Sequence, residues 1–338
     1  MSPWRRIPRK SANRDQTVHK TEVKGIALSR VSDSSGIGIA ARCAIGLSVV
    51  SECLTRPVSH RGYWRIVRRL TGRLHGSVTL ELEPGKLTVS LSDPYWMRMV
   101  ASGYQYEPEV QDWLSRVTKD STDLVDVGAN IGFWPAWFGA RNPGSRVVAV
   151  EPNTDLGALL RINTGRVQTE TFVVECAVAP RSGSGTATFH VNRAAGLHAN
   201  ASLMGGMVGP DSHEMVEVPI ASLDSILTEY RRPGHDVIVK LDIEGLETAV
   251  LQSLRDPDDS ELLFLYEDHG RDSSCEPTQW LLANTGRQVW LLVPNQSPIR
   301  IESSEMLSTL KSSPKIGYNL VALPPDAPMP ITRANGSK

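Results

Sequence analysis

The chain has 338 residues, of which 40% are hydrophobic and 22% are charged, and its formal net charge is -1. This length allows one large α/β domain preceded by an N-terminal part. A near-neutral charge argues against nucleic acid as the partner, because surfaces that follow phosphates need an excess of basic residues. The four cysteines show neither the spacing of metal ligands nor a disulfide framework, which favours a reducing cytoplasm as the location.

The N-terminal region is expected to have two parts. Residues 1–60 lack strong periodicity and predict a flexible basic extension with a short helix between Ala40 and Leu54; the apolar window 36–54 is interrupted by charges and falls short of a transmembrane segment. Residues 61–118 predict a small cap. It consists of an amphipathic basic helix around 64–70, a hairpin turning at 83–86, and a helix over 104–117 that is entered through Glu107 and Pro108.

From residue 119 to 325 strand and helix patterns alternate, which predicts a mostly parallel sheet with helices on both faces. Strands are expected at 124–127, 146–150, 171–176, 237–241, 262–266, 289–293 and 318–323. Helices are expected at 131–140, 156–163, 222–229, 247–254 and 278–284. Two further alternating runs, 185–191 and 215–219, flank a Gly/Ala/Met-rich loop at 194–210, and residues 326–338 form a C-terminal tail.

The segment from Asp123 to Gly132, DLVDVGANIG, predicts the strand, turn and helix start of a nucleotide-binding domain. A dinucleotide fingerprint needs a second glycine where this chain has Asn130, so the loop suits a ligand without a diphosphate. S-adenosylmethionine (SAM) is such a ligand, because its amino-acid end can pair with Asp126 and the loop amides. The alternative is that Asp126 only caps the turn and the glycines serve packing.

Acidic and small residues at later strand ends extend this binding site. Glu151 follows the second strand at the distance from Gly128 at which an acidic side chain accepts the ribose hydroxyls. Cys176 and Ala177 end the third strand, where small side chains leave room for an adenine ring.

A second group of ionisable residues is expected to carry the chemistry. Lys240, Asp242 and Glu244 alternate along a buried strand end, and Glu267 and His269 end the next strand. These side chains should meet the Asp126 loop at the carboxyl edge of the sheet. There they can position an acceptor oxygen and take its proton. The structural alternative is a Lys240–Asp242 ion pair, with Glu244 and Glu247 stabilising a helix start; oxygen ligation of Mg²⁺ ranks below an acid–base role.

With these motifs, the chain resembles the FkbM family of class I SAM-dependent methyltransferases over roughly residues 103–323. The resemblance rests on DVGANIG at 126–132, Glu151-Pro152-Asn153 and KLDIEGLE at 240–247. It implies a Rossmann-like, seven-stranded sheet whose last two strands form an antiparallel hairpin, and an O-methyl product on a sugar or polyketide-type natural product. The residues that it implies for SAM binding are Glu107, Asp126, Gly128, Asn130, Gly132, Glu151, Asn153, Cys176, Ala177 and Asp242.

The sequence therefore predicts a cytoplasmic SAM-dependent O-methyltransferase. Its catalytic candidates are Asp242 first, His269 and Glu267 second, and Glu244 third. The expected partner is a small-molecule acceptor, with no nucleic acid, no metal and no transmembrane segment, and a homo-oligomer remains open. Two other functions stay under consideration: a nucleotide-dependent oxidoreductase or epimerase, and a non-catalytic scaffold with the SAM-binding fold that uses its basic N-terminal arm.

Overall fold

The structure is a computed structural model that describes residues 31–33, 76–97, 99, 105–180, 185–192, 201–202, 213–243 and 245–328. The described strands form three sheets. The expected helices at 40–54 and 64–70, the 194–210 loop apart from 201–202, Glu244 and most of the C-terminal tail lie outside the described residues. The flexible extension and the cap with these boundaries therefore stay predictions.

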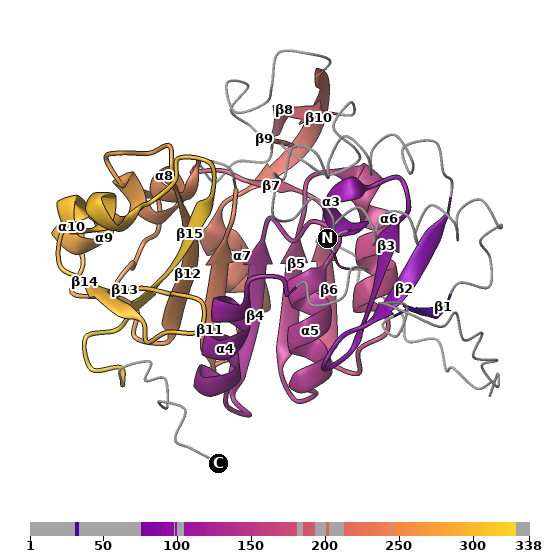
Figure 1. Cartoon of the computed structure of the whole chain (residues 1–338), viewed down its shortest axis with the longest axis horizontal. Helices are drawn as coiled ribbons and strands as arrows, with labels where there is room; N and C mark the ends of the chain where they lie inside the picture. Colours follow the sequence, from indigo (N-terminus) through magenta and orange to yellow (C-terminus); the bar gives the residue numbers. More distant parts are fainter. Residues whose placement is uncertain are drawn as a thin grey trace.

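The main sheet carries the fold, with strand order β14-β13-β15-β12-β11-β4-β5-β6 (Figure 1). Its members are β4 (Thr122–Val127), β5 (Arg146–Val150), β6 (Glu170–Val174), β11 (Asp236–Leu241), β12 (Leu262–His269), β13 (Gln288–Leu291), β14 (Ile299–Ile301) and β15 (Gly317–Leu323). Pairing is parallel from β6 through β12, and β15 runs antiparallel to both β12 and β13. This confirms the mostly parallel α/β sheet, to which β14 adds a short eighth strand.

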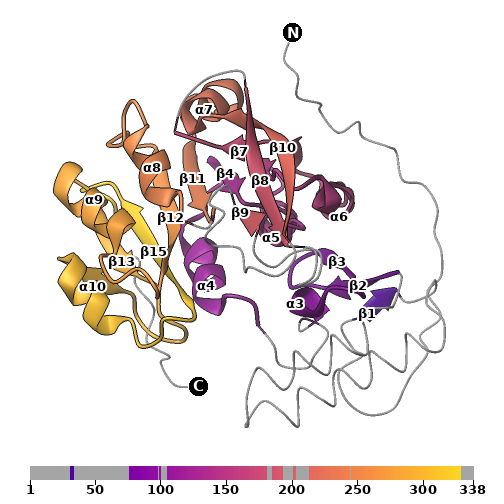
Figure 2. The same ribbon diagram turned by 90° about the horizontal axis from the view of Figure 1, so that it is seen from above.

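Helices cover both faces of this sheet, as Figure 2 shows from above. On one face lie α4 (Pro108–Val117), α5 (Phe133–Arg141) and α6 (Thr154–Thr164), where Trp113, Phe133 and Phe138 fill the core. On the other face lie α7 (Leu223–Tyr230), α8 (Glu247–Gln252), α9 (Glu276–Asn284) and α10 (Ser304–Leu310), which pack on the apolar side chains of β11 and β12. Because both faces are covered, the central strands β4 and β11 are buried along nearly their whole length and are mostly apolar, as is typical of parallel strands.

The expected hairpin is formed by β2 (Ser77–Glu81) and β3 (Lys86–Ser90), and β1 (Val31–Asp33) pairs with its outer side. Its apolar side chains join the core on the α5 face. Asn163 of α6 closes the other edge of the hairpin: its amide accepts a hydrogen bond from Thr88 N (2.6 Å) and donates to Thr88 O (3.0 Å) and Ile131 O (2.8 Å). One buried amide thus joins the hairpin, α6 and the loop after β4.

A smaller sheet stands above the carboxyl edge of the main sheet (Figure 1). It contains β7 (Ala177–Val178), β8 (Thr186–Asn192), β9 (Ala201–Ser202) and β10 (His213–Ala221), and the antiparallel β8–β10 pair confirms the two alternating runs. The short helix α3 (Pro94–Met97) lies on the same side of the main sheet. The carboxyl edge is therefore covered from two directions, which produces an enclosed site.

Candidate active site

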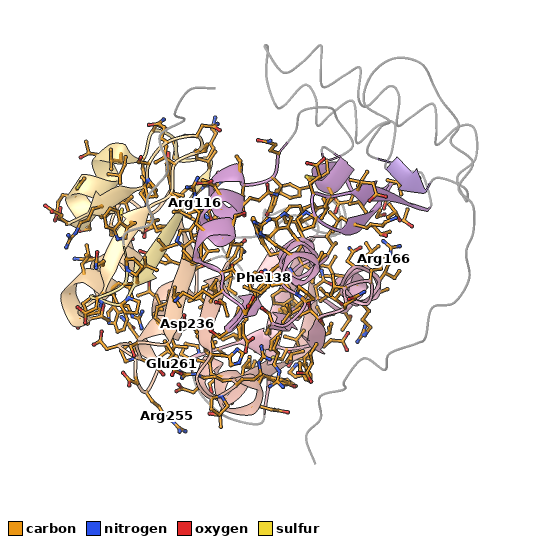
Figure 3. All side chains as sticks on the ribbon, turned by 90° about the horizontal axis from the view of Figure 1, so that it is seen from below. Arg116, Phe138, Arg166, Asp236, Arg255 and Glu261 are labelled. Atoms are coloured by element: carbon orange, nitrogen blue, oxygen red, sulfur yellow. The ribbon has the colours of Figure 1, made fainter. Side chains whose placement is uncertain are left out.

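A cavity of about 430 Å³ opens at the carboxyl edge of the main sheet. Its lining comes from the loops after β4, β5, β6, β11 and β12, from the loop before β15, and from α3 and the residues that precede α4. Figure 3 views the molecule from below, where Asp236 and Glu261 mark the opposite edge, at the starts of β11 and β12. The expected placement at the carboxyl ends of the strands is what parallel topology produces.

The loop after β4 is held against the end of β11. Gly128 has φ +86°, and a Cβ placed on it would lie 2.0 Å from the carbonyl oxygen of Asp242, so a side chain does not fit there. Asn130 is also left-handed, at φ +53°, and its side-chain oxygen accepts hydrogen bonds from Ile131 N (2.8 Å) and Trp96 Nε1 (3.1 Å). This bound amide occupies the position where a dinucleotide fingerprint has its second glycine.

Glu151 connects the two loops on the β5 side of the cavity. Its carboxylate accepts hydrogen bonds from the backbone N–H of Asn130 and of Asn153, each at 2.8 Å. Burial raises the pKa of Glu151 to about 7, although both of these hydrogen bonds oppose the rise. The Asn153 side chain caps α6 by accepting from Asp155 N, while its buried Nδ2 atom has no hydrogen-bond partner among the described residues. Both residues therefore keep hydrogen-bonding capacity toward the cavity.

Lys240 is the buried cation of the site. Its Nζ lies 2.9 Å from Asp242 Oδ2 and 3.8 Å from Asp126 Oδ1, and these residues come from neighbouring strands. Burial disfavours the charged amine, but Asp242, Asp126 and Glu107 together raise the pKa of Lys240 above its usual value. Burial likewise raises the pKa of Asp126 to about 6, whereas Lys240 outweighs burial at Asp242 and lowers the pKa of that carboxyl. The ion pair considered as an alternative exists, and it lies inside the cavity wall.

Glu107 is a third carboxylate that interacts electrostatically with Lys240. It is the left-handed residue that precedes α4, and its carboxylate accepts a hydrogen bond from Trp134 Nε1 at 3.0 Å. Burial raises the pKa of Glu107 to about 7, against the lowering effect of Lys240. Behind it Tyr106 contacts Phe133, with ring centroids 4.7 Å apart, and Trp96, at 5.1 Å. These aromatic rings form an apolar wall beside the carboxylate, which strengthens its charge interactions.

Glu267 and His269 line the cavity on the β12 side. The Nδ1 atom of His269 lies 3.9 Å from Glu267 Oε1, and Glu267 contributes to lowering the pKa of Asp242. Asp268 points the other way, where the buried Lys311 donates to its Oδ1 at 2.6 Å and to the backbone oxygens of His269 and Asp272, each at 2.7 Å. Lys311 thus fixes the end of β12 from behind the site.

Most of the remaining candidates are near the cavity, with two exceptions. Cys176 and Ala177 line its β6 side. Gly132 lies behind the loop at the N-cap of α5, packed toward Leu160, which places it away from the lining. Glu244 lies outside the described residues. Its neighbour Glu247 is buried and accepts the backbone N–H groups of Ile243 and Gly245, each at 2.9 Å, which orders the loop after β11.

Several lining residues were not anticipated from the sequence. They are Tyr95, Trp96, Tyr106, Phe133 and Trp134 on the aromatic wall and Arg271 and Lys315 at the mouth. A concentration of aromatic residues around 95–106 was the available signal for the wall. No local pattern marked the two cations, because their loops meet only through the pairing of β12 with β15.

The described residues contain neither a metal-ligand cluster nor a membrane-spanning helix. In that part of the chain, no three His, Cys, Asp or Glu side chains are grouped so that they could hold a metal ion. None of its helices is both long enough and apolar enough to cross a membrane.

The sheet order, the antiparallel β15 and the acid-lined cavity at the carboxyl edge define a class I methyltransferase fold. Residues 126–271 match the family model of the methyltransferase FkbM domain. A curated relative, 31-O-demethyl-FK506 methyltransferase FkbM from Streptomyces tacrolimicus, is 30% identical over 157 residues, and the match covers 40% of this chain and 60% of that protein. Residues 126–271 are thus similar to the methyltransferase domain of FkbM proteins.

Solved structures of distant sequence are also similar to the chain. Precorrin-6y C5,15-methyltransferase from Geobacter metallireducens GS-15 is 14% identical with a TM-score of 0.38, covering 64% of this chain and 87% of that one. A probable spermidine synthase from Corynebacterium glutamicum ATCC 13032 is 10% identical with a TM-score of 0.35, covering 74% and 79%.

Proposed function

We propose that the chain transfers a methyl group from SAM to a hydroxyl oxygen of a small molecule, a sugar or a natural product. The observation that carries this proposal is the convergence of Glu151, Asp242 and His269 on one cavity, within the segment that matches the FkbM methyltransferase domain. The curated relative acts on 31-O-demethyl-FK506, which supports an oxygen acceptor.

The cavity fits SAM in its chemistry. Glu151 offers a carboxylate for the ribose hydroxyls, and Cys176 and Ala177 leave space for the adenine. The Oδ1 atom of Asp126 is buried without a hydrogen bond among the described residues, so it can accept from the ammonium group of the ligand. Glu107 adds negative charge to the cavity. When bound, SAM supplies an electrophilic methyl group on a sulfonium.

The residues on the β11 and β12 side would orient the hydroxyl of the acceptor and take its proton. Lys240 keeps Asp242 ionised, so this carboxylate is a strong hydrogen-bond acceptor for the incoming hydroxyl and orients its oxygen. A carboxylate with a lowered pKa is a weak base. We therefore assign the hydroxyl proton to His269, which Lys311 holds in place through its backbone oxygen and which has Glu267 beside it.

The proposal is tested by calorimetry with SAM and with NAD, followed by incubation with hydroxylated sugars and natural products and a search for the mass gain of one methyl group. Asp126→Ala should weaken SAM binding, whereas Asp242→Asn should keep SAM binding and lower turnover by about 100-fold. Asp236→Asn, at the opposite end of β11, is the matched control and should behave like the parent. Tight NAD binding without SAM binding, or parental activity in both site variants, would refute the proposal.

A further inference from the structure

The strand order divides the cavity into two halves. Asp126, Glu151 and Cys176 lie at or just after the ends of β4, β5 and β6. By contrast, Asp242 follows β11, and Glu267 and His269 lie at the end of β12, next to β15. Under the proposed function, on which this inference rests, the first half holds the methyl donor and the second half holds the acceptor. The mouth of the second half therefore contacts the part of the acceptor that lies away from its reacting hydroxyl.

Two cations form this mouth. Arg271 follows β12 by two residues, and Lys315 precedes β15 by two residues. Their loops lie side by side, since Gly270 N donates a hydrogen bond to Ile316 O at 2.9 Å, and both residues line the cavity. Ile316, which follows Lys315, is half exposed at 52% and also lines the cavity. The mouth thus carries two positive charges and one apolar side chain.

Neither Arg271 nor Lys315 is ion-paired with a carboxylate in the part of the chain that the structure describes. Other lysines near the cavity do have carboxylate partners. Lys311 is bound to Asp268, and Lys240 to Asp242. The fold therefore pairs the cations that hold its interior together, and it leaves these two facing the cavity.

The charges along the acceptor half change sign from the inside to the mouth. Asp242 and Glu267 lie inside, and Arg271 and Lys315 lie outside. A molecule with an anionic group at one end is therefore held in one direction: its anion binds the two cations and its neutral hydroxyl reaches the inner carboxylates. The reverse orientation places two anions together at short range, which is unfavourable.

We infer that Arg271 and Lys315 form an anion-binding subsite, and that the acceptor is a hydroxylated acid whose carboxylate or phosphate binds there. The subsite selects the acceptor and its orientation, while Asp242 and His269 act on the hydroxyl. Arginine suits planar, bidentate recognition of either anion, and lysine adds a point charge.

The test compares matched ligands by calorimetry, with and without S-adenosylhomocysteine. Glucuronate and glucose 6-phosphate are compared with glucose, and 3-hydroxybenzoate is compared with 3-hydroxybenzamide. At least one acid should bind about tenfold more tightly than its neutral partner, as expected for a charge-assisted contact. The two sugar acids distinguish a carboxylate from a phosphate as the preferred anion, and methyl transfer to each pair is followed in parallel.

Variants locate the subsite. Arg271→Met and Lys315→Met should each reduce the preference for the acid, and the double variant should abolish it while SAM affinity stays unchanged. Arg255→Met is the matched control, because this exposed arginine, labelled in Figure 3, is not among the residues that line the cavity. The inference is overturned if no acid binds better than its neutral partner, or if the preference survives in the double variant. Loss of SAM binding in the parent would refute the proposed function, while the titrations without cofactor still decide this inference.

Discussion

Replacing Lys240 with methionine should destabilise the protein in a manner that depends on pH. The ammonium group lies 2.9 Å from Asp242 and 3.8 Å from Asp126, and all three side chains belong to the cavity wall. Coulomb's law with an effective dielectric constant of about 20 gives about 6 and about 4 kcal/mol for these contacts. Desolvation of the lysine offsets part of this sum, so the expected loss is about 3–5 kcal/mol at pH 8.

The sign of the pH dependence follows from the carboxylates. In the parent, Lys240 holds the pKa of folded Asp242 below its unfolded value, so that carboxylate stays ionised without penalty from pH 5.5 to 8. In the variant, which lacks the Lys240 charge, burial raises the pKa values of Asp242 and Asp126 in the folded protein above their values in the unfolded chain. The stability of the variant then falls as the pH rises through the folded values. The loss of unfolding free energy relative to the parent should be at least about 1 kcal/mol larger at pH 8 than at pH 5.5.

Urea unfolding at both pH values measures this difference, with two controls. Lys240→Met combined with Asp242→Asn should recover much of the loss, because the uncompensated charge is removed with its partner. Lys86→Met breaks an exposed pair with Glu81 at 3.0 Å and should change stability by less than about 1 kcal/mol. An equal loss at the two pH values, with no recovery in the double variant, would show that Lys240 matters for packing and not for charge.

Three further predictions follow from the site. Gly128→Ala should lower SAM affinity more than tenfold and cost more stability than Gly234→Ala, because both have positive φ but only the first new Cβ meets Asp242 O; equal unfolding midpoints would contradict this. SAM affinity measured by calorimetry should rise from pH 6 to 8, because Asp126 must lose its proton to pair with the ammonium group and Glu151 must lose its proton to accept the ribose hydroxyls; a flat profile would exclude the linkage. Asn163→Ala should cost about 3 kcal/mol in urea unfolding, because three buried backbone groups lose their partners, and a cost near zero would mean that water replaces the amide.

The elements with strong periodicity could be predicted from the sequence. The strands that contain Asp126 and Lys240 are mostly apolar because both faces are buried, and the Gly128 turn has a direct backbone reason. The start of α5 at Phe133 also agrees with the restriction that Pro135 imposes on a helix. By contrast, β14 and α10 escaped prediction, since a strand of three residues and a helix with Leu307 as its buried residue carry too little pattern.

The site was predictable where its residues follow parallel strands. Parallel topology alone brings Asp126, Glu151, Asp242 and His269 to one edge, so their meeting needs no knowledge of loop conformation. The aromatic wall and the two mouth cations depend on how non-parallel segments fold over that edge. Trp96 reaches Asn130 from α3, and Lys315 reaches the site because β15 runs against β12. Such meetings between distant segments leave no local sequence pattern.

The division of the cavity at β11 has a consequence for how such enzymes diversify. The matched family segment ends at residue 271, so the loop before β15 and the segment carrying Trp96 lie outside it. Because Trp96 holds Asn130 of the donor half, only the loop before β15 is free to change which molecule is recognised without disturbing the binding of the cosubstrate. Exchanging residues 312–316 with the equivalent loop of a related enzyme should therefore retarget the reaction and leave its chemistry intact.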